Sequence, residues 1–161
     1  MKKAGIILWV FIAVPLIAWA ADRPAPQQTR EVVDYYFDGK GNGAVLMDRR
    51  VCSEIASDGE DKNDCRQPAD LATIAVGDAL FLWMNFMVPA GDQAAILVNF
   101  SHNQRVRKTA NATLKGAIRY RTWKPIPTDR AGKWTVTIVQ ELADRDLELA
   151  TFDYTVNEGA P

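Results

Sequence analysis

Short apolar or alternating runs, separated by turn-forming residues, follow one another along most of this 161-residue chain. Segments such as DGKGNG, PAGDQ and TDRAGK lie between the runs and favour turns. No run carries a 3.6-residue apolar stripe with helix caps at both ends. Many short strands at near-regular spacing therefore predict an all-β, antiparallel β-sandwich of about seven to nine strands. The runs are VVDYYF (32–37), AVLMDRRV (44–51), LATIAV (71–76), ALFLWMNFMV (79–88), AAILVNF (94–100), QRVRKT (104–109), LKGAIRYRTW (114–123), KWTVTIVQ (133–140) and LELATFDYTV (147–156).

The first twenty residues have the three parts of an export signal. Lys2 and Lys3 form a positive start, residues 6–17 are apolar, and Ala18-Trp19-Ala20 fits the small-x-small cleavage rule. We predict that residues 1–20 are a signal peptide cleaved after Ala20, which implies a periplasmic protein without a stable membrane anchor. The alternative is an uncleaved anchor, because the apolar run approaches membrane-spanning length.

The rest of the chain suits one domain. Removing 20 residues from 161 leaves a mature chain of 141, long enough for a sizeable core. Residues 21–31, ADRPAPQQTRE, are polar and contain prolines, so a flexible leader is expected there. Residues 32–157 then form the single predicted β-sandwich domain. Its clearest strand is KWTVTIVQ, where alternation places Trp134, Val136 and Ile138 in the core.

Cys52 and Cys65 are the only two cysteines, and both would lie in the exported chain. Thiols in an oxidising compartment usually pair, so we predict a structural disulfide between them. The intervening loop is rich in acids: Glu54, Asp58, Glu60, Asp61 and Asp64. We interpret it as a surface turn with solvated, mutually repelling carboxylates, held in place by the disulfide alone.

Two metals are alternatives to that interpretation. Calcium would need several converging oxygens, but the loop lacks the EF-hand spacing and carries Lys62 in its middle. Copper would use the soft or imidazole donors Met47, Met84, Met87 and His102. Met84 and Met87 are three residues apart, which places them on opposite faces of a strand. No metal or cofactor is therefore predicted.

Catalytic motifs are missing from the sequence. It has one histidine, both cysteines are expected to be oxidised, and neither G-x-S-x-G nor H-E-x-x-H occurs. A carboxylate pair could act in principle, but no pattern marks one. We therefore predict that the protein is not an enzyme.

The run ALFLWMNFMV is apolar on both faces of a strand. One face carries residues 80, 82, 84, 86 and 88, and the other carries Phe81, Trp83 and Met87. Large apolar patches are rarely left exposed, so something must cover the second face. The N-terminal segment or a neighbouring loop would be an ordinary cover, and a partner protein or a second copy would be a functional one.

Charge is segregated in the second half of the chain. Residues 103–133 hold nine basic side chains against Asp129 alone, whereas residues 141–158 hold six acids against Arg145. Adjacent strands of opposite charge often pair across a sheet, which is one interpretation. The other is a basic face, with Trp123 beside Arg119 and Arg121, that binds anionic polymers or an acidic protein.

The C-terminal half resembles a known family. RYRTWKPIPTDRAGKWTVTIV followed by LATFDYTV is similar to the ending of domain-of-unknown-function family 2914, a bacterial envelope family, and VGDALFLWMNF is similar to one of its strands. The resemblance implies an immunoglobulin-like fold in the envelope and transfers no catalytic residue. The residues that carry it are Gly77, Asp78, Trp83, Arg121, Thr122, Trp123, Gly132, Trp134, Val136 and Phe152.

Together these features predict a periplasmic, non-enzymatic interaction module. Its partner would be an envelope protein or an anionic polysaccharide, and nucleic acid is not expected in an exported compartment. An envelope hydrolase or its inhibitor is the alternative, and a calcium- or copper-binding protein is the third. The expected partner-binding residues are Phe81, Trp83, Met87, Arg119, Arg121 and Trp123.

The exported protein is expected to start at Ala21 and to lack free thiols, given its cleavage site and cysteine pair. Intact-mass analysis with and without reduction, followed by alkylation, measures both properties. A retained Met1, or two thiols that alkylate without reduction, would contradict the expectation.

Overall fold

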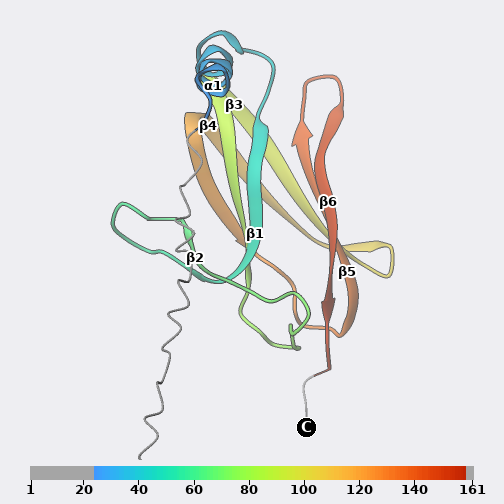
Figure 1. The fold of residues 1–161 in the computed structure, drawn as a ribbon. Coiled ribbons are helices and arrows are strands. Elements are labelled where there is room, and N and C mark those ends of the chain that lie inside the picture. The colour runs from blue at the N-terminus through green and yellow to red at the C-terminus, as the bar shows by residue number, and fades with distance from the viewer. Residues whose placement is uncertain (1–23, 159–161) are drawn as a thin grey trace, which may run out of the picture.

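The computed structural model describes residues 24–158, which form one helix and a six-stranded antiparallel sheet (Figure 1). This architecture confirms the all-β prediction. The predicted signal peptide, residues 1–20, lies outside the described residues. In the described part, no helix is long and apolar enough to cross a membrane. The elements are α1 (Pro26–Asp38), β1 (Val45–Ile55), β2 (Cys65–Pro68), β3 (Phe81–His102), β4 (Arg105–Pro125), β5 (Gly132–Glu141) and β6 (Asp146–Val156).

Strands β3 and β4 are 22 and 21 residues long, because each joins two runs that the sequence suggested were separate. The expected turn PAGDQ is instead a bend within β3, where Gly91 has a φ of +79°. Gly116 of β4 faces this bend, and a Cβ there would lie 2.8 Å from the Pro89 carbonyl oxygen. The described residues therefore hold six strands, fewer than the seven to nine that we predicted.

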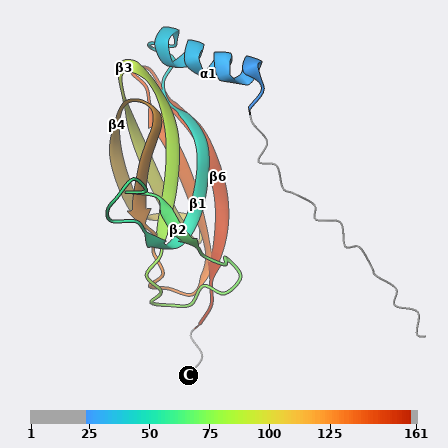
Figure 2. The same cartoon turned by 60° about the vertical axis from the view of Figure 1, so that its left-hand side comes forward.

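The bent hairpin of β3 and β4 joins the two halves of the sheet. The first half of β3 pairs with β1 and β4, and its second half pairs with β4 and β5. Strand β2 extends the sheet beyond β1, and β6 extends it beyond β5. Figure 2 shows the strands running along one elongated body with α1 across one end. Both halves of β3 contribute to one core, which also includes Leu114, Trp134, Val136, Ile138, Tyr154 and Val156.

Helix α1 corrects two predictions. Residues 32–37, expected to be a strand, form its second half, and residues 26–31 of the expected flexible leader form its first half. Pro26 suits the first helical position, because its fixed φ is preorganised and its missing N–H would have had no partner. The helix ends at Gly39, whose N–H donates to the Tyr35 carbonyl oxygen at 2.9 Å. The β-branched and aromatic residues of VVDYYF favour a strand, but the helix signals at Pro26 and Gly39 outweigh this preference.

No residue of α1 is buried, and few contacts hold the helix to the sheet. The Tyr35 hydroxyl donates to the Gly43 carbonyl oxygen at 3.0 Å, and the Gly41 N–H donates to Asp92 Oδ2 at 2.7 Å. Burial raises the pKa of Tyr35, and the nearby Asp92 carboxylate raises it further, so the hydroxyl stays a donor. The helix is therefore fixed at its C-terminal end.

Strand β5 confirms the face assignment made from its alternation. Trp134 is 1% exposed, and Val136 and Ile138 are fully buried. The Trp134 indole N–H donates to the Arg130 carbonyl oxygen at 3.0 Å, so its polar atom is satisfied inside the core. Trp134 also stacks on Tyr154, with ring centroids 6.2 Å apart.

Replacing Trp134 with alanine should lower the free energy of unfolding by about 3–5 kcal/mol, as large aromatic truncations in cores do. Phe37→Ala is the control, because Phe37 is 65% exposed on α1 and should change stability by less than about 0.5 kcal/mol. Denaturant titration measures both variants. An unchanged midpoint for Trp134→Ala would show that this side chain is not in the core.

Candidate functional site

The first half of β3 and its two neighbours form a sheet surface that points away from the core, which we call the outer face. Trp83 pairs with Arg50 of β1 and with Trp123 of β4. One step along, Asn85 pairs with Asp48 and Arg121. Because residues two apart on a strand share a face, these side chains lie on one surface. The outer face comprises Asp48, Arg50, Cys52, Phe81, Trp83, Asn85, Met87, Arg119, Arg121 and Trp123.

Residues 53–64, which we call the disulfide loop, fold back over this face. The bond between Cys52 and Cys65 closes the base of the loop and confirms the predicted disulfide. The Asn63 N–H donates to the Ala56 carbonyl oxygen, and the Ala56 N–H donates to the Asp64 carbonyl oxygen, both at 2.8 Å. Figure 1 shows the loop standing out beside β2 at the left of the molecule.

The loop buries the Trp83 indole. Its N–H donates to the Asn63 carbonyl oxygen at 2.7 Å, and Trp83 is only 4% exposed. Asn63 reaches this position with a φ of +66°, a left-handed conformation that asparagine tolerates better than most residues. A neighbouring loop of the same chain is thus the cover that the apolar second face of β3 requires.

Asp64 fastens the loop to β4 by charge. Its Oδ2 lies 2.6 Å from Arg121 Nη1 and 3.1 Å from Arg119 Nη2. The side chains of Asp64 and Arg121 are 18% and 21% exposed, so this ion pair is partly shielded from water. Arg121 also donates to the Glu60 carbonyl oxygen at 3.3 Å. The prediction that the loop acids are solvated, with the disulfide alone holding the loop, is therefore wrong for Asp64.

The basic and acidic segments meet across the sheet at one end only, where residues 132 and 133 of β5 pair with residues 155 and 156 of β6. In the part of the chain that the structure describes, β4 pairs only with β3, and β6 pairs only with β5. Among residues 24–158, the one salt bridge between the two segments joins Lys133 and Asp153 at 2.7 Å. Hydrogen bonds from Lys133 and from Thr135 lower the pKa of Asp153. The cross-strand interpretation is therefore wrong for β4, which is an edge strand of the described sheet with seven basic residues and no acid.

An aromatic groove of about 470 Å³ lies on one side of the disulfide loop. The Phe81 and Trp123 rings meet edge to face with centroids 5.1 Å apart, and Trp123 is 38% exposed. The rest of the lining comes from the end of β1 and from the disulfide loop. The groove is lined by Ser53, Glu54, Ile55, Ala56, Ser57, Asn63, Phe81 and Trp123.

A polar pocket of similar volume lies on the other side of the loop. Arg50 and Asp48 form a salt bridge at 2.8 Å in its wall, and Arg119 borders it. Asn85 also lines the pocket, and its buried Oδ1 has no hydrogen-bond partner within residues 24–158. The loop therefore divides the outer face into an aromatic side and a charged side.

The structure separates the six predicted partner-binding residues into three pairs. Trp83 and Met87 are buried within the chain, at 4% and 5% exposure. Phe81 and Trp123 line the aromatic groove, while Arg119 and Arg121 hold the loop that forms its wall. Sequence reasoning missed Ile55 and Asn63, since only the folded position of the loop brings them to Trp123.

The residues considered for metals have other roles. Met84 is buried in the core, and His102 packs against Trp134 with its Nε2 3.1 Å from the Ala131 carbonyl oxygen. Asp64 is engaged with arginines. Within the described range, no group of three or more His, Cys, Asp and Glu side chains could hold a metal ion.

No family model matches the chain, and no curated protein matches it. The resemblance to domain-of-unknown-function family 2914 therefore stays a prediction. The geometry of the outer face carries the functional argument.

Asp64→Asn should lower the free energy of unfolding by about 1.5–3 kcal/mol, because it removes a charge-assisted hydrogen bond from a shielded arginine. Asp61→Asn is the control, since Asp61 is exposed and has no salt bridge within residues 24–158. A double-mutant cycle that combines Asp64→Asn with Arg121→Gln should give a coupling energy of about 1–2 kcal/mol between the two side chains. Equal losses for the two single Asn variants, or zero coupling, would mean that Asp64 does not fasten the loop.

Proposed function

We propose that this chain is a periplasmic, non-enzymatic interaction module that binds an acidic partner along β4 and in the aromatic groove. The partner is an envelope protein or an anionic polysaccharide, and the protein is favoured. Strand β4 has a free edge, whose backbone groups suit an added polypeptide strand better than a sugar chain. The proposed fold is an immunoglobulin-like sandwich, which the single core shared by both halves of the sheet supports.

The observation that carries the proposal is the exposed Trp123 beside this free edge. Tryptophan and arginine are enriched among the residues that dominate binding energy at interfaces. Both residue types occur together here, because Arg119, Arg121 and Trp123 follow one another at every second position of β4. The edge-to-face contact with the Phe81 ring holds the Trp123 indole in position before a partner binds.

Charge supports an acidic partner. Strand β4 carries seven cations without an acid, which attracts a negatively charged chain and speeds its encounter. The outer face is not uniformly basic, because most carboxylates of the disulfide loop remain exposed and make the tip of the loop negative. An acidic partner is therefore directed to β4 and away from the tip of the loop.

Trp123→Ala should weaken partner binding by about 30-fold, the loss typical of a central interface tryptophan. The assay uses immobilised mature protein and periplasmic extract, with captured proteins quantified by mass spectrometry across a dilution series. Leu147→Ala is the matched control, since Leu147 is an apolar residue of β6 that is 39% exposed, close to the 38% of Trp123, and lies outside β4 and the groove.

Capture that falls equally with both variants, or with neither, would contradict the docking site. Digesting the extract with protease before capture separates the two partner classes. If an acidic polysaccharide is then retained in a Trp123-dependent way, the partner is the polymer instead of the protein.

A further inference from the structure

A β-bulge interrupts β4 near the β3–β4 turn. Phe100 pairs with Lys108, but the next residue, Ser101, pairs with Val106, so Arg107 is an extra residue without a partner. A bulge of this kind changes the direction of the side chains beside it, and bulges are common next to functional sites. Without it, Arg107 and Lys108 would point to opposite faces of the strand.

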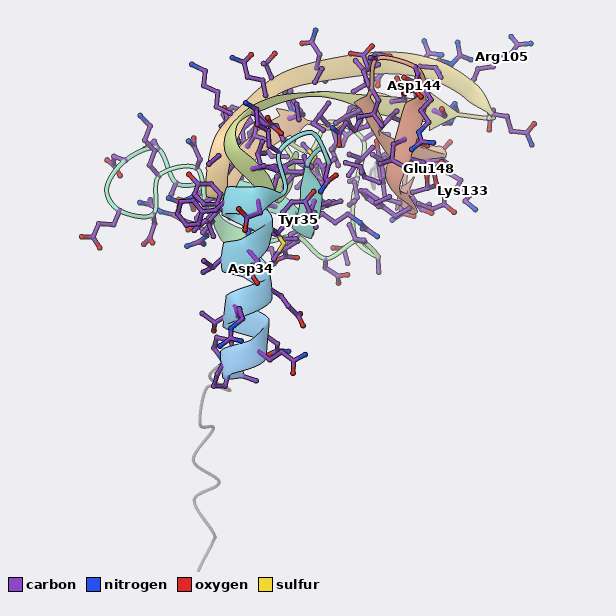
Figure 3. The ribbon with its side chains drawn as sticks, turned by 90° about the horizontal axis from the view of Figure 1, so that it is seen from above. Asp34, Tyr35, Arg105, Lys133, Asp144 and Glu148 are labelled. Atoms are coloured by element: carbon purple, nitrogen blue, oxygen red, sulfur yellow. A yellow bond between two sulfur atoms is a disulfide. The ribbon has the colours of Figure 1, made fainter. Side chains whose placement is uncertain are left out.

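The bulge brings both cations to the border of one pocket. This cationic pocket has a volume of about 410 Å³ and is lined by Arg107, Lys108, Pro127, Asp129, Arg130 and Trp134. Three basic side chains from two separate segments therefore surround one cavity. In Figure 3, the labelled Arg105 lies at the end of the same hairpin and extends outward, far from α1.

Hydrogen bonds from core side chains fix the backbone of the pocket walls. The Trp134 indole N–H donates to the Arg130 carbonyl oxygen at 3.0 Å, and the Tyr154 hydroxyl donates to the Pro127 carbonyl oxygen at 2.6 Å. Burial raises the pKa of Tyr154, and the Asp129 carboxylate raises it further, so this hydroxyl remains a donor. Lys108 Nζ donates to the Pro125 carbonyl oxygen at 2.9 Å, which uses one of its three protons.

The cations of the pocket are largely uncompensated. Arg107 takes part in no salt bridge within residues 24–158. Arg130 meets Asp129 only at 3.5 Å, with both side chains more than half exposed. Three cations against one carboxylate leave a formal charge of +2 around the cavity. A phosphate monoester carries close to two negative charges at neutral pH and matches this value, whereas a carboxylate carries one.

We propose that the cationic pocket binds a phosphate group. The two guanidinium groups can each present two N–H donors to phosphate oxygens, and Lys108 adds a compact charge. The group could be free inorganic phosphate or the phosphate of an anionic lipid headgroup. The site shares no lining residue with the aromatic groove. Arg107 and Lys108 also belong to the basic strand β4, but phosphate binding is measured without the docking partner proposed above.

The test is an NMR titration of the oxidised mature protein with inorganic phosphate, at ionic strength held constant with sodium chloride. Saturable shifts are expected at the Arg107 and Arg130 side-chain N–H groups. The double variant Arg107→Gln/Lys108→Gln should weaken binding at least about tenfold. Arg105→Gln/Lys115→Gln is the matched control, because it removes the same charge from exposed positions of β4 outside the pocket.

A second arm measures sedimentation with phosphatidylcholine vesicles that contain or lack phosphatidic acid, a lipid whose headgroup is a phosphate monoester. Binding only to the vesicles that contain phosphatidic acid, lost in the pocket variant and kept in the control, identifies the lipid headgroup as the source. Phosphate binding without vesicle binding identifies free phosphate. If neither arm shows saturable binding, or if both double variants lose it equally, there is no phosphate pocket and only a diffuse basic field.

Discussion

The first half of β3 is apolar on both of its faces, and this constraint shapes the rest of the structure. The core covers one face with residues from both halves of the sheet. On the other face, an uncovered Trp83 would expose a large apolar ring to water. The loss of burial free energy would be a sizeable part of the small net stability of a single domain. The disulfide loop solves the problem locally, because it brings a carbonyl oxygen to the indole N–H and excludes water from the ring.

The disulfide and the Asp64 contacts have separate effects on that loop. The bond between Cys52 and Cys65 restricts the unfolded chain, a contribution of about 3 kcal/mol for a loop of this length. The disulfide alone does not determine whether the loop lies over the outer face of the sheet. The salt bridges from Asp64 to Arg121 and Arg119 determine this, since they tie the loop to β4. The same contacts leave Trp123 exposed at the wall of the groove, which connects the folding constraint to the proposed binding site.

Local patterns predicted much of the sheet but little of the site. Alternation in KWTVTIVQ placed Trp134, Val136 and Ile138 correctly, because a strand with one solvated face records its orientation in sequence. The turn signal at PAGDQ was real, yet it bends β3 without ending it, since Gly116 allows close approach from the paired strand. The pairing of Asp64 with Arg121 spans 57 residues, and no local pattern encodes it. The bulge at Arg107 could not be predicted from the sequence of β4 either, because register depends on how two strands pair.

The structure requires that the disulfide loop stays closed over Trp83 in solution. Hydrogen exchange of the tryptophan indole protons, followed by NMR, measures this cover at a single atom. We expect slow exchange for Trp83 and Trp134, whose indole N–H groups donate to the Asn63 and Arg130 carbonyl oxygens, and fast exchange for the exposed Trp123. Exchange of the Trp83 indole proton as fast as that of Trp123 would contradict the claim, because the loop would then lie away from the outer face.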